Sequence, residues 1–288
     1  MSIEERFRTG QSLKQLSTFG IGGPVRYYLA ATQISEIEQA IQWSVSHQIS
    51  YFILGKGSNC LFDDRGFNGV VIHNKIDFCT FNGREAHVGA GSSFARLGAL
   101  SAKRGLSGLE FAVGIPGSVG GAIFMNAGAG GRETSQTVDE VLYLHESGEQ
   151  KIYSRGDFQF ANRYSSFQTM RGSILSARFV FDENPDARQT QSSHIDCRRA
   201  TQPYREKSAG CIFRNPPQKS AGALIDQCGL KGLCVGGAKV SEIHANFIIN
   251  ASHATQADVM SLIEQIQQRV FQQTGIRLEP EVRLVPYE

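Results

Sequence analysis

The chain has 288 residues, 41% hydrophobic and 19% charged, a balance typical of a folded globular protein rather than a disordered or fibrous one. Its formal net charge is +2, so no strong field points to nucleic acid or an acidic membrane. The sequence has no apolar run near the roughly 18 residues of a membrane helix, and its charged start lacks a secretory apolar region. We therefore expect a cytoplasmic protein without membrane or nucleic-acid partners.

The N-terminal half alternates short helical and extended patterns. Residues 34–47 predict a helix, because Ile34, Ile37, Ile41 and Val45 share one face, and Ser35 and Glu38 fit a capping box. Short apolar runs predict strands over residues 51–54 and 69–72. A helical repeat through Phe94, Leu97 and Leu100 ends at Gly105, and residues 174–181 predict another strand.

The C-terminal third begins with a polar stretch. Residues 182–193 contain Pro185 and predict a linker. A strand is expected at residues 247–249, the clearest amphipathic helix runs from Val259 to Phe271 before Gly275, and residues 281–285 predict a last strand. Because helices and strands mix without strict alternation, the fold class is α+β.

Three glycine-rich segments could hold phosphate groups: residues 18–23, 55–61 and 114–128. Glycine lets backbone N–H groups turn toward an anion, and Ser and Asn add donors. None of the segments has the spacing of a Walker motif or of a Rossmann dinucleotide site. Each alone is more simply a tight turn, but three together favour a large cofactor with a diphosphate.

These loops, above all the run from Gly105 to Gly128, resemble the flavin-binding signatures of the UDP-N-acetylenolpyruvoylglucosamine reductase family, and the resemblance extends from Thr18 to Val285. It implies an FAD-binding module of the flavin-oxidase (PCMH-type) kind over residues 1–187, in lobes of about 1–75 and 76–187. A smaller α+β substrate-binding domain would follow over residues 188–288, its last strand returning to the flavin.

The resemblance also implies an activity. NADPH would reduce FAD, and UDP-N-acetylglucosamine enolpyruvate would then be reduced to UDP-N-acetylmuramate, a peptidoglycan precursor. The residues implied to hold FAD are Gly55, Lys56, Gly57, Ser58, Asn59, Gly114, Ile115, Pro116, Gly117, Ser118, Gly121, Ile123 and Asn126.

Three residues match the family's catalytic positions, although each alone would more simply be structural. Arg163 follows Asn162 where the family usually has tyrosine, and its guanidinium would hold the enolic carboxylate. Glu281, directly followed by valine, would work with it. Cys211 stands where the family usually has a serine proton donor; with an ordinary pKa of about 8.5, a thiol is a far stronger acid than a hydroxyl.

Weaker matches imply contacts with substrate for Tyr164, Gln202, Asn215 and His244, although His244 could equally be structural. The six cysteines form no C-x-x-C pair and the histidines show no metal spacing, so we expect free thiols and no metal. Only 47 residues lie between Arg163 and Cys211, as expected for a shorter subtype without an extra substrate-clamping loop. We expect a monomer.

Two other functions compete with the reductase. A flavin-dependent oxidase on the same fold would often tether its flavin through a histidine in the first phosphate loop, but residues 55–61 contain none, and only Cys60 could substitute. A non-catalytic nucleotide-binding protein would be expected to lose the charged site residues, yet Arg163 and Glu281 are present. The reductase is therefore the favoured interpretation.

Overall fold

The computed structural model describes residues 2–288, which divide into two compact units. The first unit comprises residues up to Arg8, Tyr27–Lys56 and Gly69–Arg198; the second comprises Thr9–Arg26, Gly57–Asn68 and Arg199–Glu288. We expected residues 1–187 to form one module, but by compactness two early segments group with the C-terminal part instead. The functional division into a cofactor module and a substrate domain stays a prediction.

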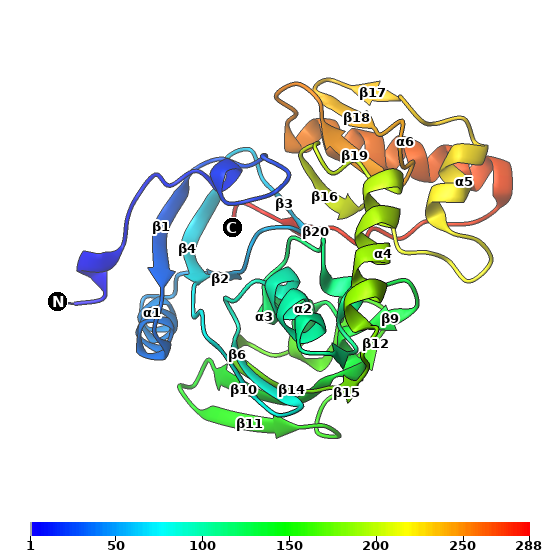
Figure 1. Ribbon diagram of the computed structural model, residues 1–288. Coiled ribbons are helices and arrows are strands. Elements are labelled where there is room, and N and C mark those ends of the chain that lie inside the picture. The colour runs from blue at the N-terminus through cyan, green and yellow to red at the C-terminus, as the bar shows by residue number, and fades with distance from the viewer. Residues whose placement is uncertain (1) are drawn as a thin grey trace. The chain divides into compact units, whose positions relative to one another are not determined.

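A three-stranded sheet of order β1-β4-β2 lies mostly in the first unit and is built from β1 (Val25–Ala31), β2 (Tyr51–Leu54) and β4 (Phe67–Asn74). Strands β2 and β4 run parallel, with Leu54 opposite His73. Helix α1 (Ile34–Ser46) connects β1 to β2, as the apolar spacing predicts, and packs its buried face on this sheet (Figure 1). The predicted capping box at Ser35 is wrong: the N-cap is Gln33, and the Glu36 carboxylate accepts from the Thr32 and Gln33 N–H groups.

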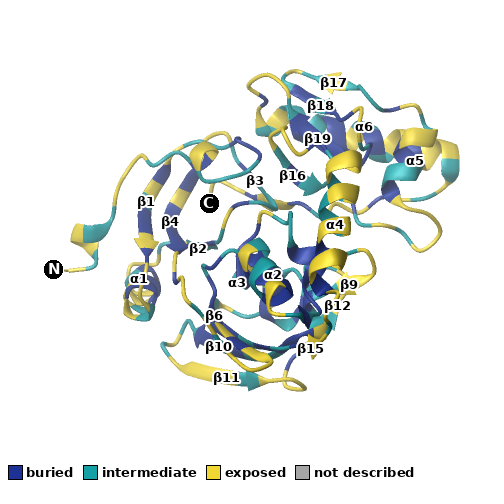
Figure 2. Cartoon of the chain, viewed as in Figure 1, coloured by how far each residue is buried: buried dark blue, intermediate teal, exposed yellow. Residues whose placement is uncertain are grey.

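A second sheet in this unit is antiparallel, of order β11-β10-β14-β6-β5. Because successive side chains of a strand point to opposite faces, β10 serves two cores. Its Val141 and Tyr143 pack with α2 and α3, while Leu142 and Leu144 pack with α1. Edge strand β11 is mostly exposed, as its yellow ribbon in Figure 2 shows. The elements are β5 (Cys79–Asn82), β6 (Glu85–Gly89), β10 (Val138–His145), β11 (Gln150–Ser154), β14 (Gly172–Val180), α2 (Phe94–Lys103) and α3 (Val119–Phe124).

Three short antiparallel pairs complete the first unit. They join β7 (Leu106–Ser107) to β15 (Asp182–Glu183), β8 (Gly128–Ala129) to β9 (Arg132–Glu133), and β12 (Phe160–Ala161) to β13 (Tyr164–Ser165).

The predicted linker over residues 182–193 is wrong. Its first residues form β15, and from Ala187 it enters α4 (Ala187–Thr201). Pro185 precedes the helix, where proline is tolerated. The sequence looked like a linker because α4 is polar on nearly all sides: only Ala187 and Gln191 are buried, and the Gln191 side chain donates to the Gly98 carbonyl over 2.9 Å.

The second unit is built on an antiparallel sheet of order β16-β19-β18-β17. Helices α5 (Ala221–Gln227) and α6 (Gln256–Thr274) pack on it through one core. Helix α6 ends at Gly275 in the left-handed region, φ 72°, as the sequence predicts. The strands are β16 (Ser208–Cys211), β17 (Cys234–Val235), β18 (Ala238–Val240) and β19 (Phe247–Asn250).

A separate parallel pair in this unit joins β3 (Cys60–Phe62) to the last strand, β20 (Arg283–Val285). The predicted final strand is therefore present, though two residues shorter at its start. Within residues 2–288, no helix is both long and apolar enough to cross a membrane.

Candidate active site

The first predicted phosphate loop begins where β2 ends, at Gly55. Two of its glycines are required by close packing. A Cβ at Gly55 would lie 2.3 Å from Ser118 Oγ, and one at Gly57 would lie 2.3 Å from the Leu16 carbonyl oxygen, with Gly57 itself at φ 59°. No other residue fits either position without displacing a neighbour. The loop is therefore a tightly specified backbone path.

The second predicted loop, Gly114 to Ser118, leads into α3. Ser118 is 2% exposed, and its hydroxyl accepts from the Gly121 N–H over 3.2 Å. The same hydroxyl faces Gly55, so the first unit brings the start of the first predicted FAD loop against the end of the second. This juxtaposition of segments far apart in sequence is what a shared ligand would require.

Some residues predicted to hold FAD are buried among protein groups. Ile123 is fully buried, and so is Asn126. The Asn126 side chain donates to Glu133 and to the Ala161 carbonyl and accepts from the Ser135 N–H. Its hydrogen-bonding groups thus serve the protein. Asn126 steadies the start of the β12–β13 turn, and its contact with FAD stays a prediction.

The other predicted phosphate segment, residues 18–23, has a simpler explanation. Phe19 and Ile21 are core residues, 0% and 2% exposed. A Cβ at Gly22 would lie 2.8 Å from Phe62 Cβ, and one at Gly23 would lie 2.3 Å from the Asp64 carbonyl oxygen. Protein packing accounts for these glycines, so this segment is the weakest of the three candidates.

A second positive charge, Lys75, which no sequence pattern indicated, lies near Lys56 at the first loop. Burial, and then repulsion from Lys75, lower the pKa of Lys56, while Asp77 opposes the shift. Two lysines at one loop make a field that favours an anion. Lys75 follows β4, and the parallel pairing of β4 with β2 is the signal that could have placed it beside this loop.

Arg163 lies in the first unit, in the turn between β12 and β13, where Ala161 pairs with Tyr164. Its φ of 55° is left-handed, a conformation that costs a non-glycine residue about 1–3 kcal/mol. The guanidinium donates to the Gly128 carbonyl over 3.1 Å, and the Gln168 side chain donates to the Arg163 carbonyl over 3.0 Å. The strained turn therefore directs this side chain toward Gly128.

The second unit brings Cys211 and Glu281 together. Cys211 ends β16, and the Glu281 N–H donates to the carbonyl of the next residue, Ile212, over 2.7 Å. The Asn59 side chain, from the first predicted FAD loop, donates to the Glu281 carbonyl over 3.2 Å. Three predicted site residues that are remote in sequence thus meet along one backbone path. Arg163 belongs to the other unit.

The strand end that carries Cys211 is held by buried Asn246. Its side chain donates to the Phe213 carbonyl over 2.8 Å and accepts from the Phe213 N–H over 2.9 Å. A register irregularity precedes Cys211 in the pairing of β16 with β19, and Gly210 has φ 81°. The chain around Cys211 is therefore bent and fixed by specific contacts. Nothing in the local sequence distinguished Asn246.

The predicted substrate residues are distributed over both units. Tyr164 begins β13 in the first unit, and Gln202, Asn215 and His244 belong to the second. The Asn215 side-chain oxygen accepts from the Ala221 N–H over 3.0 Å, so it helps to begin α5. Burial lowers the pKa of His244, and its Nδ1 accepts from the Asn246 N–H over 3.2 Å. Both residues have structural roles whatever else they contact.

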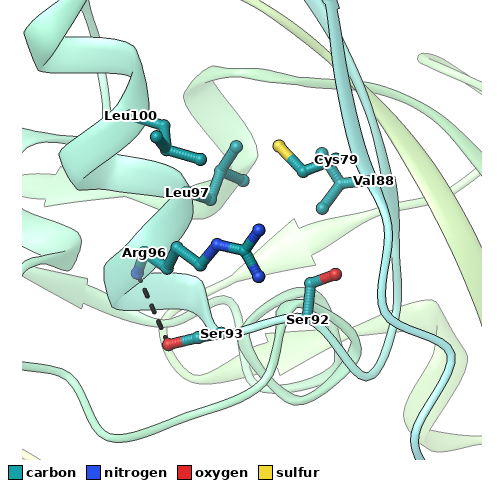
Figure 3. A pocket seen from close by; sticks show the side chains of 7 residues that line it. All are labelled: Cys79, Val88, Ser92, Ser93, Arg96, Leu97 and Leu100. Carbon is teal, nitrogen blue, oxygen red and sulfur yellow. Dashed lines mark hydrogen bonds between the residues drawn. The ribbon is translucent and has the colours of Figure 1, made fainter.

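Two further features bear on the alternatives. Burial raises the pKa of the Cys60 thiol to about 11, so the thiolate needed for a covalent flavin tether is scarce. Figure 3 shows a shallow depression between α2 and the β5–β6 hairpin, lined by Cys79, Val88, Ser92, Ser93, Arg96, Leu97 and Leu100. It contains none of the predicted site residues and has no room for a ligand.

Comparison with known proteins gives matches over most of the chain. Residues 25–152 match the model of an FAD binding domain, and residues 202–285 match that of the UDP-N-acetylenolpyruvoylglucosamine reductase C-terminal domain. The chain is 52% identical to the UDP-N-acetylenolpyruvoylglucosamine reductase of Protochlamydia amoebophila, over 100% of this chain and 97% of that protein. It is 47% identical to the enzyme of Chlamydia abortus, over 96% and 93%.

A solved structure is similar as well. The crystal structure of the UDP-N-acetylenolpyruvylglucosamine reductase of Thermus caldophilus has a TM-score of 0.82 and 34% identity, covering 97% of this chain and 100% of that one.

Proposed function

Because the chain belongs to the UDP-N-acetylenolpyruvoylglucosamine reductase family, we propose that its predicted site residues carry out the reaction of that family. The protein is an FAD-containing oxidoreductase that uses NADPH to reduce UDP-N-acetylglucosamine enolpyruvate to UDP-N-acetylmuramate, for peptidoglycan synthesis. FAD, when bound, would supply the chemistry of hydride transfer from NADPH to the enol-ether carbon.

The FAD pyrophosphate is held by the two loops that meet at Gly55 and Ser118. Support comes from the packing there, since a Cβ at Gly55 would fill the space beside Ser118 Oγ. The paired charges of Lys56 and Lys75 would stabilise the phosphates electrostatically. Backbone N–H groups of glycine-rich turns supply uncharged donors that approach an anion closely.

Each of the three catalytic residues has a separate role in the reaction. Arg163 binds the carboxylate of the enolpyruvyl group and stabilises the negative charge that builds on it. Cys211 donates its thiol proton to the carbon beside that carboxylate. Glu281 orients the reacting groups next to Cys211. The observation that carries this proposal is the 2.7 Å hydrogen bond from the Glu281 N–H to the Ile212 carbonyl, which sets Glu281 beside Cys211.

The substrate is contacted by Tyr164, Gln202, Asn215 and His244. The chain is also a shorter subtype of the family, without an additional substrate-clamping loop. In support, α4 takes up residues 187–201 of the interval between Arg163 and Cys211. We also propose a cytoplasmic monomer, since free thiols at all six cysteines suit a reducing compartment.

Replacing Cys211 separates its chemical role from a structural one. We expect Cys211→Ala to abolish substrate reduction while NADPH still reduces the bound flavin at nearly the normal rate, both followed by stopped-flow absorbance. Cys211→Ser should keep measurable turnover, because a hydroxyl can still donate a proton. Cys234→Ala is the matched control: that cysteine is exposed in the same unit, and its thiol donates to the Gly232 carbonyl.

Loss of both half-reactions in Cys211→Ala would mean that Cys211 is structural. A folded but inactive Cys211→Ser would mean that the thiol does more than donate a proton.

A further inference from the structure

A buried hydrogen-bonded pair lies behind the first phosphate loop. The Tyr28 hydroxyl, on β1, and His73 Nδ1, on β4, are 2.8 Å apart, and each residue is 6% exposed. Burying two polar groups is unfavourable unless both are hydrogen-bonded, so a buried pair of this kind calls for a structural or functional explanation. Neither residue belongs to the predicted site.

The position of His73 beside the first phosphate loop provides that explanation. His73 pairs with Leu54 in the parallel β2–β4 ladder, and Gly55, which opens the loop, is the next residue after Leu54. The backbone of Gly55 also lies close enough to the His73 imidazole to act on its pKa as a hydrogen-bond acceptor does. That contact favours the protonated ring, as a bond to a carbonyl does, while burial and Lys75 lower the pKa of His73 to about 4.

These contacts fix the state of the ring. At neutral pH His73 is uncharged, so it has one N–H and one acceptor nitrogen. With Nδ1 accepting from the Tyr28 hydroxyl, Nε2 carries the hydrogen and is the ring atom that can donate to the Gly55 carbonyl. A chain of polar contacts therefore runs from the Tyr28 hydroxyl through His73 to the loop backbone.

Peptide geometry carries the effect onward. The Gly55–Lys56 peptide is trans, as are all the described peptide bonds, so its carbonyl and its N–H point in opposite directions. Holding the Gly55 carbonyl toward buried His73 turns the Lys56 N–H away from the core. That is the direction from which an anion would approach the loop.

We propose that Tyr28 and His73 are positioning residues that preorient the Gly55–Lys56 peptide for the FAD pyrophosphate. This rests on the proposed role of the first loop in holding FAD. His73 lies beside the start of the loop, opposite Leu54, and the pair makes its contribution through the loop backbone. A preoriented donor raises affinity because the ligand does not have to order it.

The test is FAD binding by the full-length protein stripped of flavin, followed by quenching of flavin fluorescence, together with ³¹P NMR of the bound pyrophosphate. We expect His73→Phe, which keeps a flat ring without hydrogen bonds, to raise the Kd for FAD about tenfold and to shift the ³¹P resonances. His73→Gln, whose amide can accept and donate, should restore most of the affinity and the normal resonances.

The matched control is His145→Phe. The His145 Nε2 and the Tyr153 hydroxyl form a pair of the same 2.8 Å length in the same unit, on β10 and β11. We expect that variant to bind FAD as the unaltered protein does. Should His73→Phe fold poorly, Tyr28→Phe removes only the hydroxyl and should weaken FAD binding by a smaller factor with the same ³¹P shift.

Unchanged FAD affinity and ³¹P resonances in the His73 and Tyr28 variants would overturn the inference, as would an equal loss in His145→Phe. Lys56→Gln separates this failure from that of the loop assignment. If Lys56→Gln weakens FAD binding and the His73 variants do not, only the positioning role falls. If Lys56→Gln and the His73 variants all leave FAD binding unchanged, the loop does not hold the pyrophosphate and the inference falls with it.

Discussion

Replacing Gly55 by alanine tests the contact between the two FAD loops. The new Cβ would lie 2.3 Å from Ser118 Oγ, closer than these atoms can approach. The hydroxyl must therefore move and give up its 3.2 Å hydrogen bond from the Gly121 N–H. Losing a serine N-cap costs about 1 kcal/mol, and crowding a packed site adds about 1 kcal/mol more. We expect Gly55→Ala to lower the free energy of unfolding by about 2 kcal/mol.

A double-mutant cycle gives this prediction its control. Ser118→Ala alone should cost about 1 kcal/mol for the lost cap. If the two changes were independent, the double variant would lose about 3 kcal/mol. The geometry predicts about 1 kcal/mol instead, because the crowded oxygen is gone and Ser118 Cβ lies an acceptable 3.4 Å from the new methyl. Urea denaturation measures the free energy of unfolding of the unaltered protein, the two single variants and the double variant, all flavin-free. Additive losses of stability would refute the contact.

Two further predictions concern groups around the site. Asn246→Ala removes both hydrogen bonds to Phe213 and leaves buried backbone groups unsatisfied, so urea denaturation should show a loss of about 2–4 kcal/mol; a loss below about 1 kcal/mol would contradict the clamp. The His73 pKa falls from 6.5 to about 4 on folding, with Tyr28 and Lys75 facing the ring. Its contribution to stability is therefore present above pH 6.5 and lost as the pH falls toward 4, a change of about 3 kcal/mol. His73→Gln should have a correspondingly flatter stability profile over that range, and parallel profiles would contradict it.

Local patterns in the sequence predicted the elements that form by local rules. Helix α6 repeats its apolar residues at helical spacing and ends at Gly275, so both its face and its end could be read directly. The polar stretch that became α4 could not, because its burial amounts to two residues and it has almost no apolar stripe. A helix that makes so few core contacts resembles a linker in composition.

The candidate site shows the same division. The resemblance to a family selected Cys211 and Glu281, and the second unit does place them on adjoining backbone. Their neighbours could not be predicted, because Asn246 and His73 act through hydrogen bonds to residues brought near by folding. A buried polar residue has no sequence pattern of its own. Only its partners, assembled by strand pairing, give it a role.

The most direct test of the central claim is anaerobic NADPH oxidation by the purified protein, with and without UDP-N-acetylglucosamine enolpyruvate. The reductase assignment predicts that NADPH oxidation stops after one equivalent per bound flavin without substrate and continues when the enolpyruvyl nucleotide is added. Flavin reduction that the nucleotide leaves unchanged would contradict it, and would indicate a flavoprotein that passes its electrons to a different acceptor.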